Sequence, residues 1–358
     1  MTTAPDRPLT VLSVAYPFAP LGPATAGGAE QILSALDAAL VDAGHRSIVV
    51  AAAGSRCRGE LVPVPRPRGV LDDPARTAIV RHVRAAIGRG LAQPVDVVHL
   101  HGVDFLHYLP PPGVPVVATL HLPPSFYPAE ALRPARPRTH LVCVSPRQRA
   151  ACPAGAVGWT IPNGVPVDAF PAARAKGQYV VALGRICPEK GYHLAADAAA
   201  RAGRRLILAG TVFPYAAHRA YFERELRPRL GPGCRFAGPV GGARKAALLA
   251  GARCLLVPSL VPETSCLVAM EALAAGTPVV AFPAGALADL VEAGRTGFLV
   301  RDATEMADAI EAAGALDPAE CRRVARRRHS ALAMAARYLA LYRALAAGRP
   351  APAVSLAS

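Results

Sequence analysis

The sequence predicts an α/β protein in which two doubly wound parallel sheets, each covered by helices on both faces, face each other across a cleft. Three observations predict this architecture. Short, continuous apolar runs alternate with helical stretches along almost the whole chain. The alternation pauses once, in turn-forming residues at 161–166, and then restarts. The length of 358 residues suits two domains of ordinary size.

In the first half, apolar runs predict buried strands and amphipathic stretches predict helices. The first helix follows a Pro/Gly-rich loop at 17–28 and ends at Gly44, a residue type that commonly stops a helix. The predicted strands are Leu9–Tyr16, Ser47–Ala52, Val95–Leu100, Val114–Leu120 and Thr139–Val144, and the predicted helices are Ala29–Ala43 and Pro74–Arg89.

The second half repeats this pattern after the junction. We expect domains at residues 1–162 and 163–328, followed at 329–358 by a C-terminal helix that packs back toward the first domain and a frayed tail. The predicted strands are Tyr179–Leu183, Arg205–Ala209, Arg253–Val257, Pro278–Ala281 and Gly297–Val300, and the predicted helices are Tyr192–Ala202, Tyr215–Arg227, Ser265–Ala275 and Ser330–Ala347.

Composition limits the classes of function. Hydrophobic residues make up 52% of the chain, enough to fill two cores, which excludes a largely disordered protein. The eight cysteines are scattered without a C-x-x-C pair, so their spacing indicates neither a zinc site nor a disulfide framework. With no signal peptide or membrane span in the pattern, we expect a soluble, cytoplasmic protein. The absence of G-x-G-x-x-G after the first strand argues against a nicotinamide or flavin enzyme.

The formal charge of +15 comes almost entirely from arginine, because Lys176, Lys190 and Lys245 are the only lysines. The densest cluster is interpreted as a solvated helix face, and a peripheral contact with the inner face of an anionic membrane is the next interpretation. No aromatic residues interleave with these cations, so we expect no nucleic-acid partner. The cluster consists of Arg322, Arg323, Arg326, Arg327 and Arg328.

Two carboxylates lie eight residues apart, Glu263 just before a predicted helix and Glu271 two turns inside it. At about 1.5 Å per residue they stand roughly 12 Å apart, with free backbone N–H groups near 265–268 between them. Because a helix N-terminus attracts anions, a diphosphate fits there. Glu263 could then accept hydrogen bonds from sugar hydroxyls, and Glu271 from ribose hydroxyls. Alone, the pattern is equally typical of a capped helix with exposed glutamates.

Two cations stand five residues apart in Gly184–Gly191, a Gly/Pro loop after a predicted strand. Arg185 can make a forked contact with a phosphate, and Lys190 supplies a point charge. In a chain with three lysines, a lysine at this place is a stronger signal than it would be in a protein of average composition. Alone, the spacing is typical of a surface loop.

Together these stretches resemble the family 4 retaining glycosyltransferases of the GT-B fold (glycosyl transferases group 1), which carry G-R-x3-E-K-G and E-x7-E motifs. The resemblance runs from about Leu9 to Leu345. One departure is Thr264-Ser265-Cys266, where the family often has Pro-Phe-Gly, and it leaves the selection of the donor sugar open. Further matches are Gly27-Gly28-Ala29-Glu30, 161–165 (IPNGV), 271–280 (EALAAGTPVV) and 294–300 (GRTGFLV).

The resemblance implies a retaining hexosyltransferase that moves a hexosyl group from a nucleoside-diphosphate sugar to an acceptor hydroxyl of a glycan, glycolipid or small metabolite. Arg185, Lys190 and the helix N-terminus would stabilise the leaving diphosphate, and Glu263 would position the sugar without acting as a nucleophile. The glycines would approach the phosphates through their backbone N–H groups. The donor-binding residues would be Gly27, Gly28, Arg185, Lys190, Glu263, Ser265, Cys266, Leu267, Val268 and Glu271.

Histidines add one catalytic candidate. His121, directly after a predicted strand, matches a family histidine beside the transferred sugar, so it would join Arg185, Lys190 and Glu263 as a catalytic residue. His99 and His101 alternate on one strand face and are interpreted as structural; as metal ligands they lack a third, acidic partner. Because no D-x-D motif is present and Arg185 and Lys190 supply positive charge, we expect no metal requirement of that type. The nucleoside-diphosphate sugar would be a substrate, and we expect no cofactor.

Other interpretations remain open at this stage. A nucleotide-sugar epimerase on the same fold would form product from the donor alone, and a glycosyl phosphorylase would pass the sugar to inorganic phosphate. A basic module for acidic polymers would bind with a steep salt dependence and would not need Glu263 or Glu271. The paired cations and paired carboxylates favour the transferase. The sequence specifies neither the nucleotide base, the sugar, the acceptor nor the oligomeric state.

Overall fold

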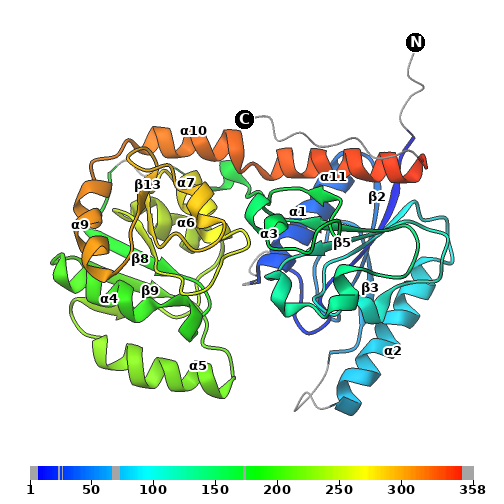
Figure 1. The fold of residues 1–358 in the computed structure, drawn as a ribbon, viewed down its shortest axis with the longest axis horizontal. Coiled ribbons are helices and arrows are strands. Elements are labelled where there is room, and N and C mark those ends of the chain that lie inside the picture. The colour runs from blue at the N-terminus through cyan, green and yellow to red at the C-terminus, as the bar shows by residue number, and fades with distance from the viewer. Residues whose placement is uncertain (1–6, 23–24, 26, 67–72, 172–174, 349–358) are drawn as a thin grey trace, which may run out of the picture. The chain divides into compact units, whose positions relative to one another are not determined.

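The computed structural model describes residues 7–22, 25, 27–66, 73–171 and 175–348 (Figure 1). The chain forms two compact units, the first from residues 1–162 and 332–358 and the second from residues 163–331. Each unit is a parallel sheet with helices on both faces, which confirms the predicted α/β architecture. The tail predicted to be frayed lies outside the described residues from position 349. Among the described residues, no helix combines the length and apolar character that a membrane crossing requires.

Within the described residues, the first unit has a seven-stranded sheet in the order β3-β2-β1-β4-β5-β6-β7. Every neighbouring pair is parallel. The chain leaves β1 in one direction toward β2 and β3, and in the other toward β4, so the sheet has its switch point between β1 and β4. The strands are β1 Thr10–Val14, β2 Arg46–Ala52, β3 Glu60–Val64, β4 Val97–Leu100, β5 Val116–Leu120, β6 Thr139–Cys143 and β7 Trp159–Thr160. The helices are α1 Gly28–Asp42, α2 Asp73–Gly90, α3 Pro146–Ala150 and α11 Ala331–Ala346.

The apolar strands of this sheet are buried on both faces. In β2, Ile48 and Val50 belong to the cluster that includes α2, whereas Val49 and Ala51 pack on the opposite face with Leu33 of α1. Because side chains alternate along a strand, a continuous apolar run fills two cores at once. This is why short runs without any polar alternation predicted the sheet correctly.

Several short elements escape the sequence pattern. The edge strand β3 contains Pro63, which a central strand would not tolerate but an edge strand does, because one side of its backbone needs no partner. The two-residue strand β7 and the three-residue strand β10 are too short to show a period. The predicted helix Tyr215–Arg227 is present but changes at Phe222 from α-helix to π-helix and ends as a 3-10 turn.

Within the described residues, the second unit has a six-stranded parallel sheet in the order β10-β9-β8-β11-β12-β13, with its switch point between β8 and β11. The strands are β8 Tyr179–Leu183, β9 Arg205–Ala209, β10 Cys234–Phe236, β11 Leu255–Val257, β12 Val279–Ala281 and β13 Gly297–Leu299. The helices are α4 Tyr192–Arg201, α5 Ala216–Tyr221, α6 Gly242–Gly251, α7 Leu267–Ala274, α8 Leu287–Leu290, α9 Ala303–Ala313 and α10 Pro318–Arg328.

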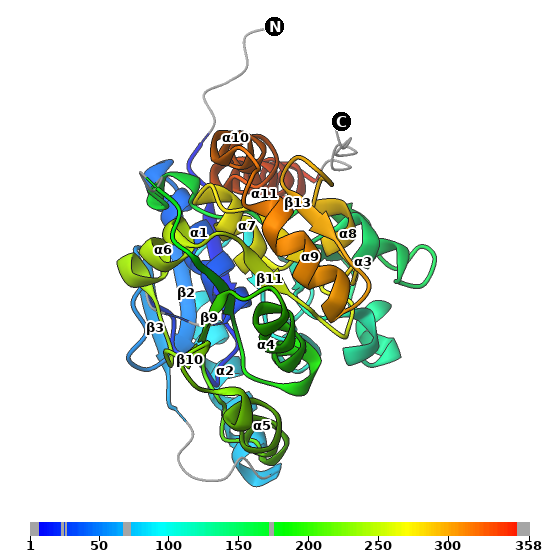
Figure 2. The same cartoon turned by 90° about the vertical axis from the view of Figure 1, so that its left-hand side faces the viewer.

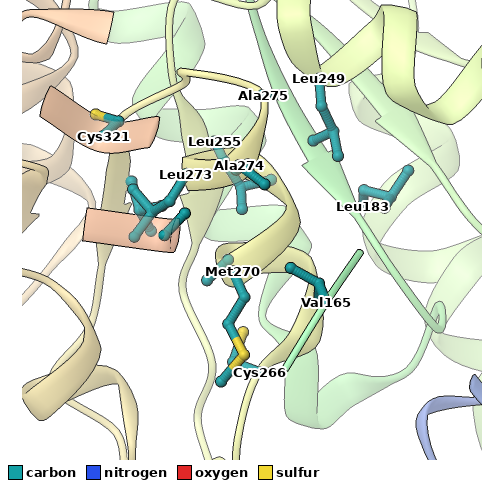
Figure 3. Packing of buried hydrophobic residues seen from close by; sticks show 14 of the residues in the cluster. Val165, Leu183, Leu249, Leu255, Cys266, Met270, Leu273, Ala274, Ala275 and Cys321 are labelled. Carbon is teal, nitrogen blue, oxygen red and sulfur yellow. The ribbon is translucent and has the colours of Figure 1, made fainter. Parts of the chain in front are cut away.

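Two cores sandwich this second sheet. On one face, Val180 and Ala182 of β8 pack against α4 and α9, which lie side by side (Figure 2). On the other face, β8 packs through Leu183 with residues of α6, α7 and α10, and Met270 of α7 lies in this cluster beside Cys266 (Figure 3). The helix α7 is therefore anchored by its buried side, which fixes its first turn in place.

The motif IPNGV is explained by a close backbone approach. The N–H of Val165 donates to the C=O of His329 at 2.8 Å, and the N–H of Ala331 donates to the C=O of Val165 at 2.9 Å. A Cβ atom on Gly164 would overlap the backbone of Ser330. The glycine in this motif is therefore required by packing.

The arginines of α10 do more than solvate a helix face. Arg322 donates to the backbone carbonyl oxygens of Phe170 and Ala274. Three others form ion pairs within the same unit: Arg323 with Glu320, Arg326 with Asp168 at 3.3 Å and Arg328 with Glu292 at 2.7 Å. The cluster thus ties α10 to neighbouring segments, which the interpretation as a solvated face did not include.

Acid is expected to destabilise the protein through His329, which follows α10. Both ring nitrogens are buried, and neither has a hydrogen-bond partner among the described residues. Burial lowers the pKa of His329 to about 4. As pH falls below the usual pKa of about 6.5, the unfolded protein takes up a proton that the folded protein does not, so stability is lost between pH 6.5 and 4.

The variant His329→Leu removes this proton uptake. Between pH 7 and 4.5 it should lose about 2 kcal/mol less unfolding free energy than the wild type, as measured by urea unfolding at both pH values. His82→Leu, at an exposed position of α2, is the control and should follow the wild type. Equal losses of unfolding free energy between pH 7 and 4.5 in the wild type and in His329→Leu would contradict this prediction.

Candidate active site

The two sequence motifs of the second unit lie at its topological switch point. The loop Gly184–Gly191 follows β8, and the segment 258–266 follows β11, the strand that pairs with β8 on the opposite side from β9. The carboxyl ends of parallel strands meet at one edge of a sheet, and loops that diverge there leave room for a ligand. Residues separated by more than 70 positions in the sequence therefore come together.

Direct contacts join the two motifs. The N–H of Leu260 donates to the C=O of Glu189 at 2.8 Å. Lys190 Nζ lies 2.5 Å from Glu263 Oε1, and the hydroxyl of Ser259 donates to the same oxygen. The side chains of Lys190 and Glu263 are 21% and 11% exposed. The structure thus brings these two sequence-predicted residues into one partly buried ion pair, and it adds Ser259, which the sequence did not single out.

The environment keeps Lys190 charged. Burial works against the ammonium group, but Glu263 outweighs this effect, and the pKa of Lys190 is raised. Arg185 is exposed on the same loop. A second positive charge is therefore available beside the ion pair, and it can meet an anion that approaches from solvent.

Gly191 is required for this arrangement. It has φ = 62°, in the left-handed region, and it is the N-cap of α4. A Cβ atom at this position would overlap the backbone oxygen of Pro258. The glycine therefore lets the loop after β8 turn and lie directly against the loop after β11.

The start of α7 offers donors for an anion. Leu267 and Val268 form its first turn, where backbone N–H groups have no acceptor within the helix. The hydroxyl of Ser265 is buried and has no hydrogen-bond partner among the described residues. A buried hydroxyl without a partner is uncommon, and a ligand oxygen at this helix end would satisfy it.

Cys266 explains the departure from Pro-Phe-Gly in physical terms. It is the N-cap of α7 and has φ = 58°, a left-handed conformation that glycine adopts freely and that strains a residue with a Cβ atom. Its side chain is buried against Met270 of α7 in the core of Figure 3. The third position of the family pattern therefore has a backbone conformation that suits glycine, although cysteine stands there.

Because of this strain, the glycine variant at position 266 should be more stable than the alanine variant, the reverse of the usual order within a helix. Cys266→Gly should be about 1 kcal/mol more stable than Cys266→Ala, because both lose the thiol but only alanine keeps the strain. Ala247→Gly on the exposed side of α6 is the control and should be less stable than the wild type by a similar amount. Denaturant unfolding of the four proteins tests this, and a Cys266→Ala variant at least as stable as Cys266→Gly would contradict it.

Glu271 lies deeper than the sequence predicted. Its side chain is 5% exposed, and its Oε1 lies 2.5 Å from Nζ of Lys245 on α6. Burial raises the pKa of Glu271, and the charge of Lys245 acts in the opposite direction. Sequence reasoning missed Lys245, although the rarity of lysine that drew attention to Lys190 applied to it equally. Its partner could not be found from spacing, because the two residues lie on different helices.

In the first unit, Gly27 and Gly28 lie at the start of α1, whose N-cap is Gly27. A Cβ atom on Gly27 would overlap the carboxylate of Glu30, which folds back over this position. Glu30 is 7% exposed, and burial raises its pKa. A side chain at position 27 would therefore displace the Glu30 carboxylate from this position. Whether Gly27 also approaches a phosphate stays a prediction.

His121 directly follows β5, and it contacts another histidine. His121 Nε2 and His101 Nδ1 lie 3.0 Å apart. His101 is buried, and its Nε2 has no partner among the described residues. A buried imidazole better tolerates an unpaired acceptor than an unpaired N–H, so His101 is assigned its proton on Nδ1 and donates to His121. This bond fixes the ring orientation of His121, and burial lowers its pKa to about 4, so the ring is neutral near pH 7.

His99 has a structural role. Its Nδ1 lies 2.6 Å from the hydroxyl of Tyr342 on α11, and its Nε2 lies 2.7 Å from the hydroxyl of Thr119 on β5. Thr119 in turn bonds to the hydroxyl of Tyr338 at 2.9 Å. This buried network attaches the last helix to the first sheet. Burial lowers the pKa of His99 well below its usual value, so the ring is neutral near pH 7.

The sequence-predicted residues thus form two groups. Arg185, Lys190, Glu263, 265–268 and Glu271 belong to the second unit, around the ends of β8 and β11. Gly27, Gly28 and His121 belong to the first unit, after β1 and β5. Both groups lie on segments that follow the carboxyl ends of strands, where ligands of doubly wound sheets bind.

Two family models match separate parts of the chain. The model of the glycosyl transferases group 1 matches residues 177–314, and that of glycosyltransferase family 4 matches residues 26–169. The phosphatidyl-myo-inositol mannosyltransferase of Mycobacterium leprae is 33% identical over 169 residues, which cover 42% of this chain and 43% of that protein. The match therefore spans less than half of this relative's length.

Solved structures show the same fold over nearly the whole length of the protein. AviGT4, a glycosyltransferase involved in avilamycin A biosynthesis, has a TM-score of 0.74 and 29% identity, covering 95% of this chain and 99% of its own. HepE from Anabaena, solved in complex with UDP and glucose, has a TM-score of 0.71 and 19% identity, covering 92% and 98%. The two family models together with these structures show that the chain belongs to the group 1, family 4 glycosyltransferases, with the GT-B fold.

Proposed function

We propose that this glycosyltransferase takes a hexosyl group from a nucleoside-diphosphate sugar held by the second unit and transfers it to an acceptor hydroxyl with retention of anomeric configuration. The observation that carries the proposal is the contact of Lys190 with Glu263 at the switch point of the second sheet, beside the first turn of α7. A cation, a carboxylate and free backbone donors are the groups that a charged sugar nucleotide requires.

The positively charged residues would bind the diphosphate. Lys190 supplies a fixed ammonium, Arg185 an exposed guanidinium, and Leu267 and Val268 the helix N–H groups. The Ser265 hydroxyl can donate to the same anion. As the bond from the sugar to the diphosphate breaks, negative charge grows on the departing oxygen, and these donors stabilise it without moving.

Glu263 and His121 would bind the hexosyl group. Glu263 Oε1 already accepts from Lys190 and Ser259, so Oε2 is the oxygen left for sugar hydroxyls. His121 carries its proton on Nδ1 when His101 donates to its Nε2, and this N–H can bond to a sugar oxygen. Because His101 acts through His121, it is a positioning residue. Retention itself is what the family resemblance implies.

Glu271, the second carboxylate of the E-x7-E motif, would bind the nucleoside. Lys245 occupies Oε1 of Glu271, which leaves Oε2 as the acceptor for ribose hydroxyls. Burial raises the pKa of Glu271, and pairing with Lys245 favours the ionised form against this effect. Lys245 thereby becomes part of the proposed donor site without contacting the donor.

Product analysis tests the proposed reaction against its alternatives. The protein is incubated with UDP-, GDP-, ADP- and TDP-sugars, each alone, with inorganic phosphate and with a panel of hydroxyl acceptors. The proposal predicts nucleoside diphosphate release that depends on an acceptor, and NMR coupling constants showing the donor's anomeric configuration in the product. An altered sugar nucleotide formed from the donor alone would support an epimerase, a sugar phosphate would support a phosphorylase, and an inverted product would contradict retention.

A further inference from the structure

Three side chains with metal-binding atoms meet outside the Lys190–Glu263 pair. Cys187 and Glu189 lie on the loop after β8, and His218 lies on α5. The Cys187 sulfur, a Glu189 carboxylate oxygen and a His218 ring nitrogen all lie within 4.8 Å of one another. The spacing of cysteines along the sequence could not reveal this group, because it contains one cysteine and a histidine 31 positions further on.

His218 provides the second, independent observation. The residue as a whole is 9% exposed, and its Nδ1 is buried without a hydrogen-bond partner among the described residues. The rings of Phe213 and Tyr215 stand edge-on to it, with centroids 6.4 and 5.1 Å away. These aromatic rings fix the orientation of the imidazole but offer its Nδ1 no hydrogen-bond partner. A buried polar atom usually has a partner, so a further group is expected at this nitrogen.

The backbone holds the loop that carries the other two ligands. The N–H of Ile186 donates to the C=O of Thr211 at 3.0 Å, and the C=O of Glu189 accepts from Leu260 at 2.8 Å. Cys187 is fully buried, whereas the side chain of Glu189 is exposed. Cys187 and His218 are therefore buried, whereas the third ligand atom belongs to an exposed side chain.

We propose that Cys187, Glu189 and His218 bind a divalent metal ion of the zinc class. A thiolate, an imidazole and a carboxylate are the ligands that Zn²⁺ and Co²⁺ take, whereas Mg²⁺ prefers oxygens alone. At metal–ligand bonds of about 2.0–2.3 Å, tetrahedral ligand atoms stand roughly 3.5 Å apart. The ligand atoms now lie 4.8 Å or less from one another, so metal binding requires a shift of about 1 Å, which the exposed Glu189 carboxylate can make. A fourth coordination position stays open for water.

The charge balance supports a divalent ion. Metal binding releases the proton of the Cys187 thiol to solvent. The resulting thiolate and the Glu189 carboxylate together carry two negative charges, which neutralise M²⁺. Arg185 is close enough to act electrostatically on all three ligands and opposes the metal, but one positive charge does not cancel two negative ones. Binding would join α5 to the loop after β8. Because a metal that binds only the folded protein stabilises it, zinc would raise the melting temperature.

Cobalt titration of the full-length protein without a histidine tag tests the site directly. We expect one equivalent of Co²⁺ to produce a thiolate-to-cobalt charge-transfer band, and Zn²⁺ to displace the cobalt and bleach that band. Cys187→Ser should abolish the band, and Glu189→Gln, at an exposed position that does not threaten folding, should weaken cobalt binding at least tenfold. Cys57→Ser, which removes a partly exposed cysteine of the first unit, should leave the titration unchanged.

Three results would overturn the proposal: no charge-transfer band in the wild type, a band that survives Cys187→Ser, or cobalt affinity that Glu189→Gln leaves unchanged. The readout needs neither nucleotide nor acceptor, so its failure would not touch the proposed transferase reaction. Failure of the transfer assay would equally leave the metal site standing.

Discussion

Replacing Lys190 with methionine should lower kcat/KM for transfer at least about 10³-fold. The variant loses a fixed positive charge beside the departing diphosphate, a class of contact that is typically worth a factor of 10² to 10³. It also leaves Glu263, 11% exposed, without its counter-charge, and breaking a buried pair from one side costs about 3–5 kcal/mol of stability. Both effects follow from one ion pair, so a single variant does not separate them.

The double variant Lys190→Met/Glu263→Gln does separate them. Glutamine keeps the acceptor for the Ser259 hydroxyl but removes the unpaired charge, so unfolding free energy should recover relative to Lys190→Met alone. Transfer should stay well below that of Glu263→Gln alone, because the diphosphate still lacks its cation. Steady-state kinetics and urea unfolding of Lys190→Met, Glu263→Gln and the double variant provide the two readouts.

Lys176→Met is the matched control. Lys176 is a second partly buried lysine of the same unit, and its Nζ donates to the C=O of Ala250 and the hydroxyl of Thr277. Its loss should reduce stability but leave kcat/KM per folded molecule unchanged. If the double variant were as active as Glu263→Gln alone, Lys190 would be structural, and its assignment to the diphosphate would be wrong.

Gly191→Ala should be the most destabilising substitution in the loop after β8, costing at least about 3 kcal/mol. Its left-handed φ of 62° accounts for about 1 kcal/mol of this. The rest arises because the new Cβ overlaps the oxygen of Pro258 and forces the loops after β8 and β11 apart. Since the contact between Lys190 and Glu263 spans the same two loops, nucleotide binding should weaken with it.

Gly203→Ala isolates the steric part of this effect. Gly203 also has φ = 62°, but a Cβ there would meet no atom within 4 Å. It should cost only the conformational term of about 1 kcal/mol and leave transfer intact. Urea unfolding of both variants gives the difference, and equal losses for Gly191→Ala and Gly203→Ala would show that the two loops do not touch as described.

The sequence predicted the parts of the fold that rest on burial. Strands such as Tyr179–Leu183 are apolar throughout because both faces are covered, and their bounds match the structure. It missed β3, whose Pro63 argues against a strand until its edge position is known. It also missed α6, Gly242–Gly251, because glycine, a residue type typical of turns, stands at both ends of this helix.

The candidate site, like the fold, was predictable from the sequence only in part. Motif spacing located Lys190 and Glu263, but only the fold shows that they touch. The partner of Glu271 was unpredictable, because Lys245 precedes it by 26 residues on another helix. The left-handed conformation of Cys266 was equally hidden, since a cysteine gives no sign of positive φ. Contacts between distant segments are set by topology, and local sequence does not record them.

Titration calorimetry with UDP, GDP, ADP and TDP tests the central claim, that the loops after β8 and β11 bind a nucleoside diphosphate. The wild type is compared with Arg185→Ala/Lys190→Ala and with Arg244→Ala, which removes an exposed arginine of α6. We predict saturable binding of one nucleotide that the double variant loses at least a hundredfold and the control retains. Binding that the folded double variant keeps, or no binding of any of these nucleotides by the wild type, would contradict the donor site described here.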